Sequence, residues 1–168
     1  MKHLPVLVLF VIAFVFVGLV ITTSSELPEK IASGFNQEGV AIGWQNKSTF
    51  TGGMLAYGFG LPAFVLGIMY SIRFFPARFL NLPNAKYWRE PENYKKACAI
   101  LFSWSQWFAC GILIWQIFFF KMIVNANQVF PPQLDNQRAT LLTIALLVFS
   151  LVWVVALCLR FLRLPKEG

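Results

Sequence analysis

Charged residues are absent from four long stretches of this sequence, and that absence decides its class. Residues 4–21, 52–72, 98–120 and 139–159 contain no Asp, Glu, Lys or Arg. Each stretch is close to the roughly 20 apolar residues that an α-helix needs to cross a bilayer. Only 12% of the chain is charged and 58% is hydrophobic, whereas soluble domains are about 25% charged. The sequence therefore predicts an all-α integral membrane protein with four transmembrane helices.

Residues that usually carry catalysis or bind metals are also scarce. The only histidine is His3, and the three cysteines, Cys98, Cys110 and Cys158, lie in or at the apolar runs. A single histidine excludes a two-histidine metal site and a Ser/His triad within one chain, and uncharged spans disfavour a proton relay. We therefore expect no metal, no cofactor and no enzymatic activity. We interpret the four carboxylates of the predicted outer loops as solvated: Glu26, Glu29, Glu38 and Asp135. The alternative is that they act as acid and base or bind a cation.

Basic residues lie at the ends of the apolar runs and form no continuous face, which argues against nucleic acid as a partner. Ten of the fourteen fall on one side of the predicted bundle: one before the first run, six in the 73–97 loop and three after the last run. Because basic loops stay in the cytoplasm, both termini are predicted to be cytoplasmic and the 22–51 loop to face outward. We expect a single membrane domain over residues 1–168. A cleaved signal peptide is the alternative for the first run, but that run is longer than a usual signal and lacks an A-x-A site.

The outer loop, residues 22–51, is about 30 residues long and is expected to be ordered. Ser24 and the residues up to Lys30 suggest one short helical turn that stops at Gly34. Asn-Gln-Glu-Gly at 36–39 predicts a tight reversal between two short extended pieces. Trp44 is expected near the membrane surface. The loop is either an ordered connector with Phe35 and Trp44 at the bilayer interface, or a recognition surface held by the helices.

Small residues recur along the second run at steps of three or four, which places them on one stripe of a helix: Gly53, Ala56, Gly60, Ala63 and Gly67. Helix association in lipid depends on close approach of the backbones, because little hydrophobic drive exists there. We therefore interpret the stripe as a packing face. Packing against another helix of the same chain is favoured, and a dimer or partner seam is the alternative.

The 73–97 loop is basic and irregular. A turn is expected at residues 81–84, and Pro91 with its acidic neighbours is typical of a helix start. We interpret its charges as sites for anionic lipid, with docking of a soluble partner as the alternative. In the third run, Gln106 and Gln116 are expected to form hydrogen bonds across helices. A cavity for a lipid or apolar ligand is the alternative there.

Two stretches resemble a known family. The pattern L-P-E-K-I-x-x-x-F-N-x-x-G-x-x-x-G-W-x-x-K-S at residues 27–48 resembles the domain of unknown function at the N-terminus of the bacterial sporulation-delaying-protein immunity family. The segment N-L-P-N-A-K-Y-W-R-E-P-E at residues 81–92 is similar to small four-helix members with that domain. The two matches cover about a fifth of the chain. Ala32 and Gly34 stand here where such proteins commonly have proline and histidine.

The resemblance implies a multi-pass protein of the bacterial cytoplasmic membrane that recognises a toxin peptide or envelope ligand and signals to a cytoplasmic repressor. It assigns recognition to outer-loop residues, Phe35, Asn36, Gly39, Gly43, Trp44 and Lys47. It assigns the inward relay to Asn81, Pro83, Asn84, Tyr87 and Trp88. The alternative is a structural or accessory subunit that joins a larger membrane complex through the stripe on the second run.

Overall fold

A computed structural model describes residues 4–164 of the chain. It contains four long helices, α1 (Leu4–Ser24), α2 (Lys47–Ser71), α4 (Pro91–Ala126) and α5 (Asn136–Leu162). A β-hairpin, β1 (Lys30–Phe35) and β2 (Ala41–Asn46), joins α1 to α2. The 3₁₀ turns η1 (Ile72–Phe74) and η2 (Ala77–Phe79) and the short helix α3 (Ala85–Trp88) join α2 to α4. Lys2 and Lys166, which carry part of the predicted charge balance, lie outside the described residues, as does His3.

All four long helices have the length and apolar composition to cross a membrane. This confirms the prediction of a membrane protein with four candidate spans. The helices are longer than the uncharged runs: α2 begins at Lys47 instead of residue 52, and α4 covers Pro91–Ala126 instead of 98–120. Charge marks where a helix leaves the hydrocarbon, but it does not end the helix, because the backbone keeps its hydrogen bonds in the headgroup layer. The connecting loops are correspondingly shorter than predicted.

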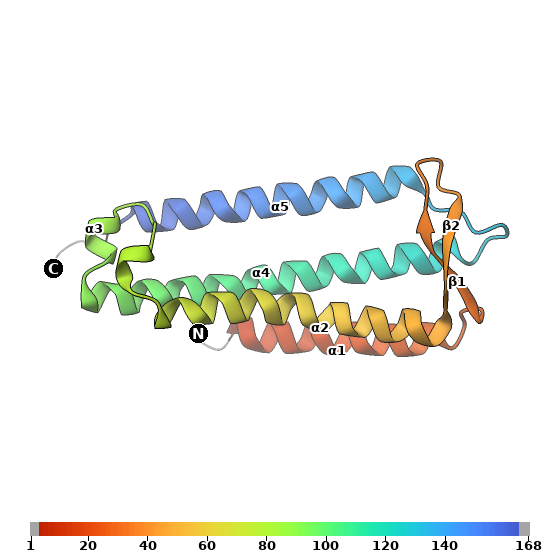
Figure 1. Cartoon of the computed structure of the whole chain (residues 1–168), viewed down its shortest axis with the longest axis horizontal. Coiled ribbons are helices and arrows are strands. Elements are labelled where there is room, and N and C mark those ends of the chain that lie inside the picture. The colour runs from red at the N-terminus through yellow and green to blue at the C-terminus, as the bar shows by residue number, and fades with distance from the viewer. Residues whose placement is uncertain (1–3, 165–168) are drawn as a thin grey trace.

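Helix α4 is the central element of the bundle (Figure 1). It packs against α1 and α2, which also contact each other, and it carries α5 on another side. The main core lies among α1, α2, α4 and the start of β1, with the buried residues Phe16, Val20, Ile31, Met54 and Phe120. The hairpin and the α4–α5 connection lie at one end, which we name the hairpin end. The opposite end, with η1, η2, α3 and the last turn of α5, is named the α3 end.

Aromatic side chains hold α5 against α4. A Cβ added at Gly111 would lie 2.2 Å from the ring of Phe149, so the ring occupies the gap that this glycine leaves. Phe149 also stacks on Phe108, with 5.5 Å between the ring centroids. Trp153 donates from Nε1 to the carbonyl oxygen of Trp104 at 3.3 Å. The aromatic residues of the third run thus fill a helix–helix contact here.

Gly58 is the glycine of α2 that packs inside the chain. A Cβ at this position would lie 2.1 Å from the Phe16 ring of α1, so only hydrogen fits. The predicted small-residue stripe lies elsewhere: Ala56 and Ala63 are exposed, and a Cβ at its three glycines, Gly53, Gly60 and Gly67, would meet nothing within 4 Å.

The expectation that this stripe packs against another helix of the same chain therefore does not hold. The buried face of α2 instead repeats every fourth residue: Phe50, Met54, Gly58 and Pro62. Small residues occur on more than one side of this helix. The side that also carries Phe50 and Met54 is buried, because these larger apolar side chains fill the interior of the bundle. The alternative, that the stripe packs against a second copy of the chain or a partner protein, stays a prediction.

Gln116 forms the hydrogen bond that was expected across helices. Its Nε2 donates to the carbonyl oxygen of Tyr57 on α2 at 3.1 Å, and the side chain is fully buried. Tyr57 precedes Gly58, whose carbonyl loses its usual helical donor because Pro62 has no N–H. The amide therefore adds a polar contact where the α2 backbone is weakened.

Candidate recognition site at the hairpin end

The reversal predicted at residues 36–39 is a tight turn between β1 and β2. The side-chain oxygen of Asn36 accepts from the backbone N–H of Glu38 at 3.1 Å and of Val40 at 2.8 Å. Gly39 has φ of 79°, a left-handed conformation that glycine adopts without strain. Asn36 and Gly39, expected to recognise a ligand, therefore build the turn.

The short helical turn expected before Gly34 is wrong, because Lys30–Phe35 is a strand. Ile31 and Ala32 are fully buried, and pairing with β2 satisfies the backbone of this segment. The two strands also approach closely at a cross-strand pair of glycines, Gly34 and Gly43. A Cβ on Gly43 would lie 3.3 Å from the Cα of Gly34, and the reverse contact is equally short. Gly43 thus sets the spacing of the strands.

Backbone hydrogen bonds attach the turn to the α4–α5 connection. The N–H of Leu134 donates to the carbonyl of Gly39 at 2.9 Å, and Val40 forms an antiparallel bridge with Gln133. The side-chain amide of Asn136, the first residue of α5, donates to the carbonyl of Gln37. The tip of the hairpin is therefore fixed to the start of α5.

Asn127 attaches the body of the hairpin to α4. Its side-chain oxygen accepts from the N–H of Ala32 at 2.8 Å, and its Nδ2 donates to the carbonyl of Ala32 at 2.9 Å. The same Nδ2 donates to the carbonyl of Ile123 at 2.9 Å. One asparagine thus satisfies both backbone groups of a buried strand residue. The sequence does not indicate this role, because an asparagine after an apolar run is typical of an ordinary helix end.

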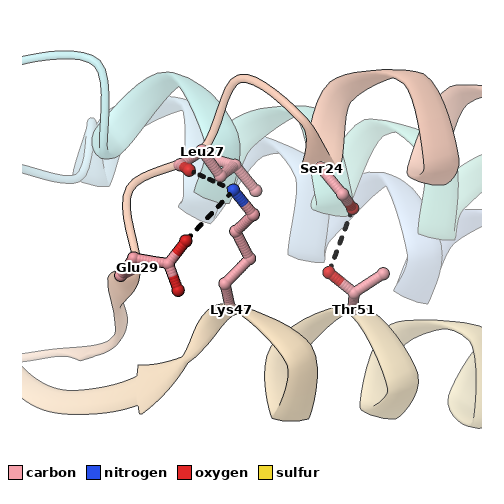
Figure 2. Close-up of polar contacts among 5 residues, drawn as sticks. All are labelled: Ser24, Leu27, Glu29, Lys47 and Thr51. Atoms are coloured by element: carbon pink, nitrogen blue, oxygen red, sulfur yellow. Dashed lines mark hydrogen bonds and ion pairs between the residues drawn. The ribbon is translucent and has the colours of Figure 1, made fainter.

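Lys47 connects the beginning of α2 to the segment that precedes β1 (Figure 2). Its Nζ donates to the carbonyl of Leu27 at 2.9 Å and lies 3.6 Å from a carboxylate oxygen of Glu29. One turn further along α2, the hydroxyl of Thr51 lies 3.0 Å from that of Ser24, the last residue of α1. Lys47, predicted to contact a ligand, therefore links α2 to the segment between α1 and β1.

Large apolar side chains in β2 and at the residue before it are exposed to the surroundings. Val40, Ile42 and Trp44 alternate along the chain and are 51%, 69% and 52% exposed; we name them the apolar strip. Phe130 in the α4–α5 connection is 97% exposed. Large apolar side chains gathered on one surface mark interaction sites. Of the predicted recognition residues, only Trp44 belongs to the strip, while Phe35 is half-buried against the core. Apolar residues at every second position from 40 to 44 were the sequence signal that could have identified Val40 and Ile42.

A cleft of about 370 Å³ lies beside this surface, between the ends of α4 and α5. Gln133, the bridge partner of Val40, is one of its lining residues. Lys121 and Arg138 bring two positive charges to the cleft, and Arg138 Nε lies 2.9 Å from Asp135 Oδ2. The apolar walls include Phe118, Met122, Val129 and Leu142.

The predicted relay residues lie at the α3 end and hold the last turn of α5. Asn84, with φ of 58°, donates from Nδ2 to the carbonyl of Leu162 at 3.0 Å. Trp88 is 1% exposed and donates from Nε1 to the carbonyl of Phe161 at 3.1 Å. Tyr87 packs edge-on against Trp88. These three residues form a clamp on α5, whereas Asn81 is exposed and Pro83 half-buried.

Within residues 4–164, no group of three His, Cys, Asp or Glu side chains is placed to hold a metal ion. Comparison with family models, curated proteins and solved structures gave no match. The resemblance carried by residues 27–48 and 81–92 therefore stays a prediction.

Proposed function

We propose that this membrane protein is a non-enzymatic recognition protein whose hairpin end binds an extended apolar or amphipathic peptide. The observation that carries the proposal is the combination of an exposed apolar strip with a rigid attachment. Val40 is bonded to the α4–α5 connection, and the strand beside β2 is held by Asn127. A surface that is fixed before binding loses less conformational entropy when the ligand arrives.

The edge of β2 supports a peptide as the ligand. The sheet has two strands in the order β1-β2, so β2 pairs on one side only, apart from the bridge at Val40. An extended peptide can add to such an edge through main-chain hydrogen bonds, while its alternate side chains contact the exposed face. Ile42 and Trp44 would then supply the apolar contacts.

The charge balance supports an orientation with the hairpin end outside. The resemblance of residues 27–48 and 81–92 supports a bacterial cytoplasmic membrane as the location. It also supports a role like that of immunity proteins that recognise a toxin peptide or envelope ligand. The long helix α4 connects the hairpin, through Asn127, to the clamp formed by Asn84, Tyr87 and Trp88. We propose this clamp as the element that a cytoplasmic repressor reads.

A structural or accessory subunit is the second candidate. The observation that favours it is the open stripe on α2, where a Cβ added at Gly53, Gly60 or Gly67 would meet no atom from another part of the described chain within 4 Å. Such a face allows a partner helix to approach the backbone closely.

Photo-crosslinking in the host's own membranes tests both candidates. A benzophenone amino acid replaces Trp44 on the strip, Ala63 on the stripe, or Phe14, an 81% exposed residue of α1 that serves as the control. We expect a defined peptide or protein adduct at Trp44 and only lipid adducts at Phe14. A protein adduct at Ala63 with none at Trp44 would favour the accessory subunit, and lipid adducts at all three positions would contradict both.

A further inference from the structure

A second cleft, at the α3 end, has the lining expected for a charged ligand. Its volume is about 480 Å³, and it is bounded by Arg73 of η1, by α4 between Ala99 and Gln106, and by Arg160 of α5. Ser103 adds a hydroxyl, and no acidic residue lines the cleft. Because this cleft lies at the opposite end from the hairpin, binding of a ligand here does not depend on recognition of a peptide at the hairpin end.

The two arginines have no acidic partner within residues 4–164, where the ion pairs are Lys47 with Glu29 and Arg138 with Asp135. Arg73 is held in place: its Nε donates to the carbonyl of Tyr70 at 3.1 Å, and its guanidinium carbon lies 3.6 Å from the centre of the Tyr70 ring. The terminal nitrogens remain available, and a guanidinium group binds phosphate through paired N–H donors.

Gln106 is the second, independent sign of a ligand. The side chain is only 8% exposed, lines the cleft, and forms no hydrogen bond with another described residue. The hydrogen bond across helices that was expected of Gln106 is therefore not formed, whereas Gln116 donates to the backbone of Tyr57 while its own Oε1 has no partner among the described residues. Polar groups with little access to water are normally paired, so the Gln106 amide at the wall of the cleft is suited to a polar group of a bound molecule.

The depth of these groups matches a phospholipid. Arg73 and Arg160 stand at the ends of the apolar runs of their helices, the level of lipid headgroups. Gln106 lies seven residues beyond Ala99, or about 10 Å further along α4 at the helical rise. Ile100, Phe102 and Trp104 form apolar walls between these levels. A free phosphate ion would leave Gln106 and these walls unused.

We propose that this cleft binds an anionic phospholipid, with its phosphate between Arg73 and Arg160 and its ester carbonyl accepting a hydrogen bond from the Gln106 amide. A charge-assisted hydrogen bond from an arginine to the phosphate strengthens binding by at least about fivefold, and residues outside the cleft do not form it, so the pair contributes at least roughly thirtyfold. The apolar walls then hold the upper part of an acyl chain.

Native mass spectrometry of the full chain in mild detergent, titrated with phosphatidylglycerol or phosphatidylcholine, tests the site. We expect tighter binding of phosphatidylglycerol, weakened at least roughly thirtyfold in the double variant R73Q/R160Q. The control R78Q/K95Q removes the same charge from exposed positions at the same end and should change binding less than about twofold. Equal binding of the two lipids, or equal losses in the two double variants, would overturn the proposal.

The variant Gln106→Leu keeps both arginines and provides a second test if R73Q/R160Q does not fold. This change should weaken the binding of phosphatidylglycerol several-fold. It should leave the competition between this lipid and soluble glycerol phosphate unchanged. Binding of phosphatidylglycerol as tight as in the wild type would overturn the role of Gln106. Competition by glycerol phosphate at equimolar concentration would identify the ligand as a free phosphate compound instead of a lipid.

Discussion

Replacing Asn127 with leucine is expected to detach the hairpin from α4 while the four helices remain. The change removes both hydrogen bonds to Ala32, a residue with 0% exposure. A buried backbone donor or acceptor that loses its partner costs about 1–3 kcal/mol, so two such groups cost about 2–6 kcal/mol. The strands would separate from the core to regain water. Hydrogen exchange of the backbone amides of Lys30–Phe35 should accelerate by at least about thirtyfold, which corresponds to about 2 kcal/mol.

Asn125→Leu provides the matched control for this experiment. Asn125 is an exposed asparagine two residues earlier on α4, and it does not contact Ala32 through any hydrogen bond. Its replacement should leave exchange in β1 unchanged. If Asn127→Leu also left exchange unchanged, the hairpin would be held by its apolar contacts and its turn, and the proposed rigid attachment through α4 would be wrong.

Replacing Trp88 with alanine is expected to cause the largest loss of stability at the α3 end. The side chain is 1% exposed, packs edge-on against Phe161 with 5.1 Å between ring centroids, and donates to its carbonyl. Truncating a buried tryptophan to alanine costs about 3–5 kcal/mol. Denaturant unfolding in detergent should show this decrease in the free energy of unfolding. It should also show a smaller loss, about 1–3 kcal/mol, for Trp88→Phe, which removes the N–H donor and part of the ring but keeps an aromatic side chain.

Trp107→Ala is the control for the Trp88→Ala variant, because it also removes a tryptophan side chain but not one that contacts the end of α5. Trp107 lies in the apolar run of α4 and is 44% exposed, so its truncation should cost less than about 1 kcal/mol of unfolding free energy. Equal losses for Trp88→Ala and Trp107→Ala would mean that Trp88 does not clamp the end of α5.

The features that the sequence predicted well are those with strong local causes. Uncharged runs identified the four spans because charge is excluded from hydrocarbon. Asn36 and Gly39 identified the reversal because the turn has local causes, namely the hydrogen bonds of the Asn36 side chain and the left-handed backbone of Gly39. The start of α4 at Pro91 was likewise marked by its proline.

The features that it missed depend on partners distant in the chain. Gly58 and Gly60 are two residues apart, and only the position of Phe16 decides which of them is buried. Asn127 acts on Ala32, 95 residues away, and nothing local distinguishes it from a solvated helix end. Several predicted recognition residues proved to shape the hairpin, because resemblance does not separate residues that hold a loop from residues that contact its ligand.

The orientation of the hairpin end is the most direct test of the central claim, that this end recognises a ligand from outside. Gln37→Cys and Lys86→Cys place an exposed thiol at the hairpin end and at the α3 end respectively, in a chain whose Cys98, Cys110 and Cys158 are replaced by serine. Intact cells are treated with a maleimide that does not cross membranes. The proposal predicts labelling at position 37 in intact cells and at position 86 only after lysis. Labelling at 86 with protection at 37 would place the hairpin in the cytoplasm and contradict it.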